Sequence, residues 1–184
     1  APGEAVGVLL PNVSNTVCLI FGMSAQRRVP AMLNYTAGTT GMQNACIAAK
    51  VKTILTSRQF MEVAKLDDAV KAIPDIDVIY LEDLRGQFNF WDKLWLLGYA
   101  RWFPTLAVKQ GKPEDPAVVL FTSGSEGKPK GVVHSHRSLL ANIAQIRAVI
   151  DFGPSDKFMI ALPLFHAFGF TCGTIMPLVT GSKM

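Results

Sequence analysis

The segment VVLFTSGSEGKPKGVVH, residues 118–134, gives the clearest indication of how this chain is built. A short apolar run, residues 118–121, stands directly before a loop of glycine, hydroxyl and lysine residues, and a second apolar run, residues 132–134, directly follows it. Open α/β sheets bind their ligands at the carboxyl ends of their strands. The segment therefore predicts a ligand-binding loop between a buried strand and a second strand.

The residue types in this loop suit a polyphosphate ligand. Glycine lets backbone N–H groups approach anionic oxygens closely, hydroxyl groups add donors and lysine adds positive charge. Pro129 stiffens the loop between the two lysines. A flexible surface hairpin is the alternative interpretation. The candidate phosphate-binding residues are Thr122, Ser123, Gly124, Ser125, Gly127, Lys128, Lys130 and Gly131.

The loop matches neither of the two common nucleotide-binding motifs. Pro129 stands where a Walker A loop has its magnesium-binding hydroxyl, and the loop contains no G-x-G-x-x-G pattern. A phosphotransferase or ATPase that used the same loop would need a magnesium-binding aspartate at the end of a nearby strand. Asp83 follows a predicted strand, but Pro129 weakens this alternative.

Outward from the loop, short apolar runs alternate with helical patterns. This alternation predicts an α/β fold with a largely parallel sheet and helices on both faces. Apolar spacing and capping residues predict helices over residues 14–28, 40–50, 57–73 and 138–150, the last capped by Ser135 or Ser138. The expected strands are residues 5–10, 29–33, 51–56, 77–81, 118–121, 132–134 and 157–162.

Composition narrows the class of protein. Hydrophobic residues make up 49% of the chain and charged residues 17%, which suits a sheet buried on both faces. The net charge of +4 is scattered, so no nucleic-acid partner is expected. Cys18, Cys46 and Cys172 lie in apolar segments and are expected to be buried, reduced thiols; no pattern of metal ligands is present. There is neither a signal peptide nor a segment suited to span a membrane, and the start at Ala1 predicts a piece of a longer protein.

All three tryptophans, Trp91, Trp95 and Trp102, fall within residues 88–103. The three share one helical face with Leu94. The segment is too short and too charged to span a bilayer, but it would suit a membrane interface. The preferred interpretation is an ordinary helix that packs on the sheet with its tryptophans buried.

Two motifs carry a resemblance to a known family. Residues 121–131 resemble the signature of adenylate-forming enzymes, Tyr/Phe-Thr-Ser-Gly-Ser/Thr-Thr-Gly-x-Pro-Lys-Gly, and depart from it only at Glu126. Residues 162–169, LPLFHAFG, are similar to the family's downstream Leu-Pro-x-x-His-x-x-Gly segment. The resemblance implies that residues 1–184 are part of the N-terminal, AMP-binding domain, that ATP and Mg²⁺ are the cofactors, and that Lys130 and His166 are catalytic residues. His166 would form a wall of the acyl pocket.

The Ser-Glu-Gly variant of the loop suggests a particular branch. Together with residues 28–38, 81–84 and 132–136, it resembles the bifunctional acyl-[acyl-carrier-protein] synthetases/2-acylglycerophosphoethanolamine acyltransferases of bacteria. This resemblance implies a fatty acid and acyl-carrier protein as partners, in a parent that also reacylates a lysophospholipid on the cytoplasmic side of the inner membrane. The ribose-binding aspartate, the late catalytic lysine and the acyltransferase domain are absent, so the piece is expected to be inactive alone. The alternative is a non-catalytic, adenylation-like module that docks carrier protein or membrane.

Overall fold

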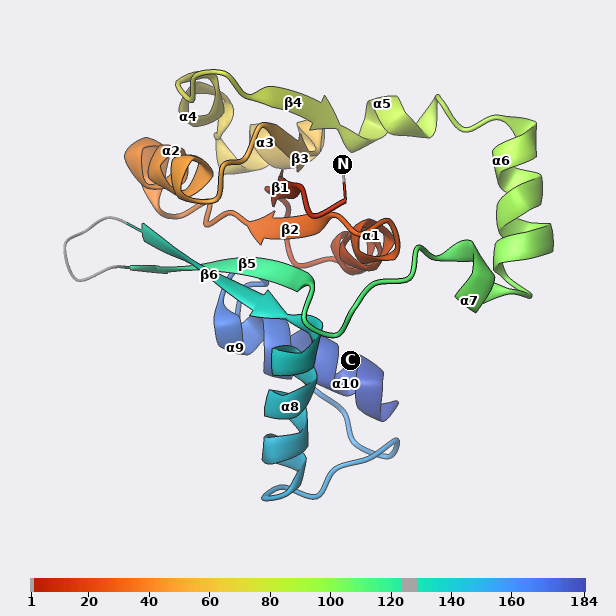
Figure 1. Ribbon diagram of the computed structural model, residues 1–184. Coiled ribbons are helices and arrows are strands. Elements are labelled where there is room, and N and C mark those ends of the chain that lie inside the picture. The colour runs from red at the N-terminus through yellow and green to blue at the C-terminus, as the bar shows by residue number, and fades with distance from the viewer. Residues whose placement is uncertain (1, 124–128) are drawn as a thin grey trace.

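Six strands form one sheet in the computed structural model, which describes residues 2–123 and 129–184 (Figure 1). The strand order is β4-β3-β1-β2-β5-β6. The first five strands pair in parallel, and β6 runs antiparallel to β5. The predicted α/β class and the largely parallel sheet are therefore confirmed. The strands are β1 (Ala5–Val8), β2 (Val29–Met32), β3 (Thr53–Thr56), β4 (Asp77–Tyr80), β5 (Pro116–Ser123) and β6 (Pro129–Ser135).

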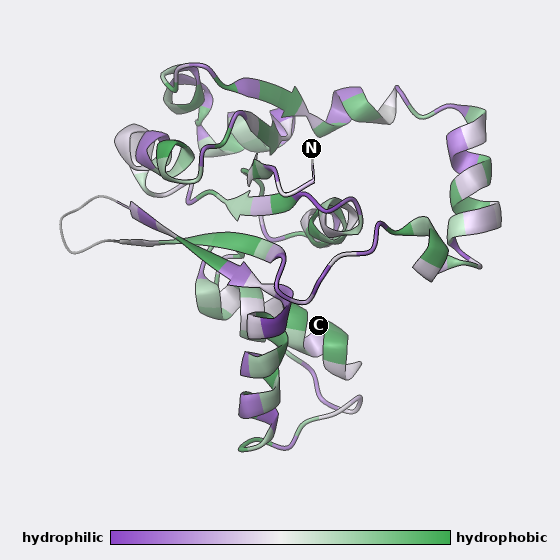
Figure 2. Ribbon diagram, in the orientation of Figure 1, coloured by the Kyte–Doolittle hydropathy of each residue, from purple (hydrophilic) through white to green (hydrophobic). Residues whose placement is uncertain are grey.

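The central strands are apolar on both sides because helices cover both faces of the sheet. On β1, Val6 and Val8 point into one core, while Gly7 leaves room in the other for Ile54 and Leu33. Figure 2 shows hydrophobic residues along β5 and in helices such as α10. The two cores hold the layers together from opposite sides.

Each core is completed by its own set of helices. One face is covered by α1 (Ser14–Ala25), α8 (His136–Arg147), α9 (Ala167–Phe170), the π-helix η2 (Thr171–Ile175) and α10 (Met176–Thr180). The other face is covered by α2 (Gly38–Ala48), α3 (Arg58–Ala64) and α4 (Asp67–Lys71). The sheet and the helices on its two faces form three layers, in agreement with the predicted helices on both faces.

Serine caps mark the starts of two predicted helices. The Ser57 hydroxyl caps α3 by accepting from the N–H of Phe60 at 3.1 Å, but Lys65 adopts a left-handed conformation (φ 53°) and divides the predicted helix 57–73 into α3 and α4. Ser135 caps α8 and forms a capping box with Ser138. Both serines therefore act at this helix start, and α8 begins at His136, two residues before the predicted start.

The predicted strand at residues 157–162 is wrong. Lys157 makes one isolated bridge with Lys183, and Met159 is 91% exposed. An apolar run becomes a strand only when a neighbouring strand supplies hydrogen-bond partners. Here the carbonyl of Leu162 accepts from the side chain of Asn12 instead.

The tryptophan-rich segment projects from the sheet as an arm (Figure 1). It consists of α6 (Phe90–Leu94), the π-helix η1 (Trp95–Ala100) and α7 (Pro104–Ala107), and α5 (Leu81–Arg85) connects it to β4. Trp91 and Trp102 are each 72% exposed and Trp95 is 49% exposed, so the preferred expectation of a packed helix with buried tryptophans is wrong. Within the described part of the chain, no helix is long and apolar enough to cross a membrane.

The three cysteines differ in accessibility. Cys46 and Cys172 are buried and free, as expected, whereas Cys18 is exposed on the outer side of α1, which corrects the expectation for that residue. Burial raises the pKa of Cys46 to about 11 and also raises that of Cys172. The thiolate is the reactive form, so both buried thiols are inert near neutral pH.

We therefore expect Ellman's reagent at pH 7.5 to modify Cys18 rapidly in the folded protein and to reach Cys46 and Cys172 only after denaturation. The measurement is the number of thiols titrated with and without denaturant. A Cys18→Ser variant that still showed one rapidly reacting thiol would contradict this assignment.

Candidate functional site

The carboxyl ends of the five parallel strands meet at one edge of the sheet. Polar and aromatic residues follow these ends in sequence: Asn12 after β1, Tyr35 after β2, Arg58 after β3, Asp83 after β4 and the predicted phosphate loop after β5. This is the edge where an open α/β sheet binds a ligand. The fold therefore brings the loop to the predicted place.

The β5–β6 hairpin carries the described part of the phosphate loop. Thr122 pairs with Lys130 and Phe121 with Gly131, so Thr122 and Lys130 lie on the same face of the hairpin. Leu120, two residues back on that face, lies in the core beneath α8. Lys130 is exposed, beyond the cover of the helices. Gly124, Ser125, Glu126, Gly127 and Lys128 lie outside the described residues.

Gly131 serves packing on the opposite face of the hairpin. A Cβ atom at this position would lie 3.3 Å from Val119 Cγ1 and 3.4 Å from Phe121 Cε1. The first contact is tight and the second is close to ordinary, so a side chain at this position would require Val119 to shift. Gly131 thus leaves room for Val119 and Phe121 next to the Thr122–Lys130 pair.

The second motif, residues 162–169, is held against the same edge by Asn12. The Asn12 side-chain amide donates to the Leu162 carbonyl at 2.9 Å, and its Oδ1 accepts from the N–H of Leu164 at 2.8 Å. His166 is exposed and stands at the N-cap of α9, with its N–H donating to the Pro163 carbonyl at 3.0 Å. Asn12 therefore positions the loop from which His166 projects.

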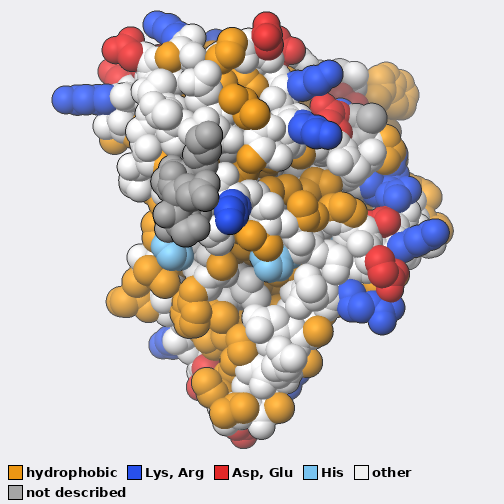
Figure 3. All heavy atoms as spheres, turned by 60° about the vertical axis from the view of Figure 1, so that its left-hand side comes forward, with side chains coloured by type: hydrophobic (Ala, Val, Ile, Leu, Met, Phe, Trp, Pro, Cys, Tyr) orange, Lys and Arg blue, Asp and Glu red, His pale blue; other side chains and the backbone are white. Residues whose placement is uncertain are grey.

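An aromatic cluster connects this loop to the ends of β2 and β3. The Tyr35 ring packs edge-on against Phe165 at 5.0 Å between centroids and against Phe60 at 5.2 Å. Phe165 in turn lies 6.3 Å from the His166 ring. Figure 3, which brings the hairpin side of the molecule forward, shows hydrophobic side chains interspersed with histidine. His166 thus adjoins an apolar wall.

The supporting roles of three residues were not identified from the sequence. Asn12 contacts a segment about 150 residues away, and no local pattern marks that contact. Tyr35 gives no signal beyond its place after a predicted strand. Gly169 was part of the second motif, and its role is steric: a Cβ there would press against the Pro163 carbonyl oxygen and lie 2.8 Å from that of Leu162.

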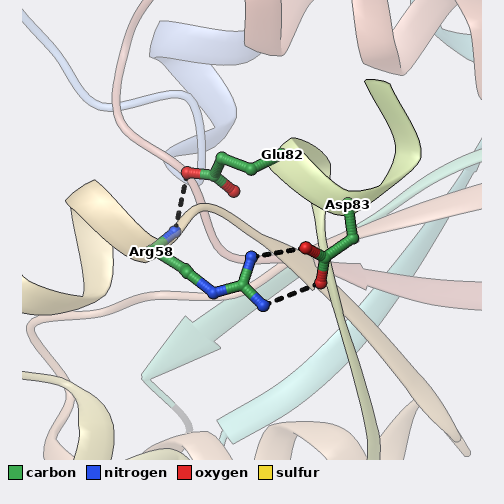
Figure 4. Close-up of polar contacts among 3 residues, drawn as sticks. All are labelled: Arg58, Glu82 and Asp83. Atoms are coloured by element: carbon green, nitrogen blue, oxygen red, sulfur yellow. Dashed lines mark hydrogen bonds and ion pairs between the residues drawn. The ribbon is translucent and has the colours of Figure 1, made fainter. Parts of the chain in front are cut away.

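Arg58 and Asp83 form an ion pair at the ends of β3 and β4 (Figure 4). The Arg58 guanidinium donates to both Asp83 oxygens, at 2.7 and 2.8 Å, and lies 4.2 Å from the centre of the Tyr80 ring. The backbone N–H of Arg58 donates to Glu82 Oε1 at 2.9 Å. We call this set the Arg58 clamp.

The clamp assigns Asp83 a structural role. The hydrogen bonds from Arg58 hold the pKa of Asp83 below its ordinary value of 3.8, so the pair is charged at neutral pH and is lost only as the pH falls through that lowered pKa. Because both carboxylate oxygens accept from Arg58, a magnesium ion at Asp83 would have to compete with this pair, which weakens the phosphotransferase alternative. The described residues contain no cluster of three or more side chains that could hold a metal ion.

A pocket also lies at the opposite edge of the sheet. It is an open hollow of about 950 Å³ between the end of α1, residues 108–116 and the start of α8. Arg27 and Asp115 pair at 2.9 Å in its wall. None of the predicted site residues lines it. Since parallel strands direct ligands to their carboxyl ends, we place the site at the hairpin edge and not in this cavity.

A mostly parallel α/β sheet with a strand–loop–strand hairpin at its carboxyl edge is the architecture of the N-terminal domain of adenylate-forming enzymes. The sequence matches the family described as AMP-binding enzyme over residues 1–184. The chain therefore belongs to the AMP-binding enzyme family, which includes acyl-CoA and fatty acyl-adenylate ligases. Ligases of this family use ATP and Mg²⁺.

Individual relatives agree with this assignment. The chain is 29% identical to 4-coumarate–CoA ligase 2 of Oryza sativa subsp. japonica, over 90% of this chain and 31% of that protein. It is 48% identical to long-chain-fatty-acid–CoA ligase 4 of Saccharomyces cerevisiae, over 33% of this chain and 9% of that protein.

Among solved structures, the inhibitor-bound N-terminal domain of FACL13 from Mycobacterium tuberculosis superposes with a TM-score of 0.76 at 23% identity, covering 100% of this chain and 44% of that one. This similarity supports the fold. The chain spans about a third of the length of the curated relatives that it matches almost end to end.

Proposed function

We propose that this chain is part of the adenylation domain of an enzyme that activates a fatty acid with ATP and Mg²⁺ and passes the acyl group to acyl-carrier protein. The observation that carries the proposal is the position of the Thr122–Lys130 pair at the carboxyl edge of the sheet, at the point where β5 runs into the glycine-rich loop. Membership of the AMP-binding family supports the reaction class.

The first step of the proposed reaction builds negative charge at the loop. A fatty-acid carboxylate oxygen attacks the α-phosphorus of ATP, the bond to the β-phosphate breaks, and pyrophosphate leaves with that bonding pair. Lys130 provides a positive charge, and the Thr122 hydroxyl a donor, on the same face of the hairpin. Both interactions strengthen as charge moves onto pyrophosphate, which is the condition for catalysis by electrostatic stabilisation. Mg²⁺ would neutralise further phosphate charge.

The remaining loop residues extend this anion-binding surface in the proposal. Gly124, Gly127 and Gly131 let the backbone approach the phosphates, and Ser123, Ser125 and Lys128 add donors. Glu126 departs from the family's hydroxyl, and its carboxylate would need a lysine or Mg²⁺ close by.

The acyl chain is proposed to lie against the aromatic cluster at the ends of β2 and β3. Tyr35, Phe60 and Phe165 present an apolar surface, and His166 stands at its margin with an exposed ring. An apolar wall with one polar group at its mouth suits a fatty acid, whose carboxylate must face ATP.

The finer assignment, to a bifunctional bacterial enzyme that also reacylates 2-acylglycerophosphoethanolamine at the cytoplasmic side of the inner membrane, rests on the loop variant containing Glu126 and on residues 28–38, 81–84 and 132–136. A second domain would carry the acyltransferase chemistry. The carrier protein would supply the thiol that attacks the acyl-adenylate and releases AMP.

The test is ATP–pyrophosphate exchange by an enzyme that contains this chain. We expect exchange that depends on added fatty acid, and transfer of the acyl group to holo acyl-carrier protein in preference to coenzyme A. Absence of exchange with every fatty acid tested would favour a non-catalytic module. Efficient transfer to coenzyme A, with none to the carrier protein, would contradict the carrier-protein assignment alone.

A further inference from the structure

Residues 88–108 form a surface whose composition differs from that of the rest of the molecule. We call this segment the aromatic arm. Of its residues, none is buried, although most are apolar. Soluble proteins seldom expose contiguous apolar patches of this kind unless the patch binds something. The large apolar residues at least 40% exposed are Phe88, Phe90, Trp91, Leu94, Trp95, Leu96, Leu97, Tyr99, Trp102, Phe103, Leu106 and Val108.

We propose that the aromatic arm docks this protein on the surface of an anionic phospholipid bilayer. The arm takes no part in the adenylation site proposed above. The proposal is therefore independent of that reaction, and the two can fail separately.

The apolar residues surround the arm instead of forming a single stripe. Leu94, Trp95, Leu96 and Leu97 follow one another in the helical part of the arm, so they point to different sides of it, and each is at least 49% exposed. A groove on a rigid protein partner covers one stripe of a helix. A helix that is apolar all round is stable only where apolar material covers it on every side, and lipid acyl chains can surround an inserted helix in this way.

The length of the arm determines its orientation in a bilayer. The continuous helical part, α6 and η1, covers residues 90–100 and is about 16 Å long, roughly half of the 30 Å hydrocarbon core. The arm is therefore expected to lie along the interface. Tryptophan and tyrosine are enriched at that depth because their rings are apolar and their N–H and O–H groups reach water.

The charges on the arm favour anionic lipid. Lys93 and Arg101 have no ion-pair partner among the described residues. The single acidic residue of the arm, Asp92, accepts from the N–H of Asn89 at 2.9 Å and so completes the capping box in which Asn89 caps α6. Two cations against one carboxylate that is already engaged complement a negatively charged membrane surface.

Both ends of the arm are tied to the sheet. At one end the Arg58 clamp fixes α5 to the edge of β3 and β4 (Figure 4). At the other end the N–H of Lys109 donates to the Ala25 carbonyl at 2.9 Å, and Asp115 accepts from the N–H of Lys112 and from Arg27. Between these ties the apolar arm is exposed to solvent, as a docking element requires.

Intrinsic fluorescence tests the proposal directly, because the three tryptophans of the chain all lie in the arm. We expect the emission of the intact protein to shift to shorter wavelength on addition of vesicles of equal parts phosphatidylglycerol and phosphatidylcholine, and to shift much less with phosphatidylcholine alone. The protein should also float with the anionic vesicles. Absence of a shift and of flotation would overturn the proposal.

Two sets of variants separate apolar from charge contributions. Replacing both Trp91 and Trp102 by alanine is expected to weaken vesicle binding at least tenfold, because the variant buries less apolar surface in the bilayer. Trp95 remains as the fluorescent probe. Lys93→Glu and Arg101→Glu should each weaken it about fivefold or more. The matched controls are Met159→Ala, exposed and apolar outside the arm, and Lys71→Glu on α4, and neither should change binding.

Circular dichroism shows whether each variant remains folded, and light scattering shows whether the protein dimerises. A variant whose helical signal is unchanged but whose vesicle binding is lost supports the arm as the docking element. Concentration-dependent dimers without vesicles, abolished by the paired tryptophan substitutions, would assign the arm to a second copy of the chain and overturn the membrane proposal.

Discussion

Replacing Lys130 by alanine is expected to slow acyl-adenylate formation about 100- to 1,000-fold, the effect of removing one preorganised group that stabilises charge in a transition state. Lys130 pairs with Thr122 where the hairpin leaves the sheet, so its charge is held near the proposed pyrophosphate and not on a free tail. The loss should appear mainly in kcat, because the interaction strengthens as pyrophosphate departs.

Two measurements check the role of Lys130. In an enzyme that contains this chain, single-turnover formation of acyl-adenylate reports the chemical step. For the 184-residue chain itself, isothermal titration measures the affinity for pyrophosphate. We expect the original protein to bind pyrophosphate weakly and the variant to bind it more weakly still. Lys71→Ala, at an exposed lysine of α4, is the control and should change neither quantity.

A second variant separates the effect of the positive charge of Lys130 from that of its geometry. Lys130→Arg keeps the charge but places it on a planar guanidinium group, and should recover part of the rate. Equal rates for the original enzyme and the alanine variant would remove Lys130 from the mechanism and leave Lys128 as the remaining lysine of the loop.

Replacing Gly169 by alanine should lower the free energy of unfolding by about 1–3 kcal/mol, the usual cost of overpacking. The new methyl group would press on the carbonyl oxygens of Pro163 and Leu162. Backbone atoms cannot rotate away as a side chain does, so α9 must shift relative to the loop that carries His166. Phe170, the next residue, is 1% exposed and would move out of its place in the core.

Urea denaturation measures the stability change, and the Michaelis constant for the fatty acid measures the displacement of the aromatic wall. Gly173→Ala is the matched control, since the nearest atom to its added methyl is Ile160 Cγ2 at 3.6 Å, an ordinary contact. We expect the control to be neutral or slightly stabilising. If both alanine variants had the same stability, the close approach at Gly169 would not constrain the loop.

Prediction from sequence succeeded where the signal is local. The alternation of apolar runs and helical patterns predicted the sheet and its layers, and Ser57 was correctly expected as a cap, as was Ser135 as one of two candidates. Residues 118–134 were correctly expected to place a loop between two strands at a carboxyl edge of the sheet. These features depend on periodicity, capping and strand direction, which neighbouring residues specify. The roles of Lys130 and His166 in catalysis remain predictions.

Prediction failed where distant residues meet. Residues 157–162 have the composition of a strand, but the structure gives them no partner strand, and Asn12 binds their end instead. The expected burial of Trp91, Trp95 and Trp102 was wrong because no described part of the chain covers these side chains. Helical spacing identifies an apolar face, but it does not show whether another part of the protein covers that face.

By itself, then, the sequence determined the α/β class, the presence of the glycine-rich loop and the family resemblance, because periodic patterns and contiguous motifs are properties of short stretches of chain. Only the tertiary structure decided that Asn12 and Tyr35 support the loop of His166, that Asp83 is engaged by Arg58, and that the tryptophans face solvent. Each of these facts depends on contacts between segments far apart in the chain. Such contacts are specified by the packing of the whole molecule.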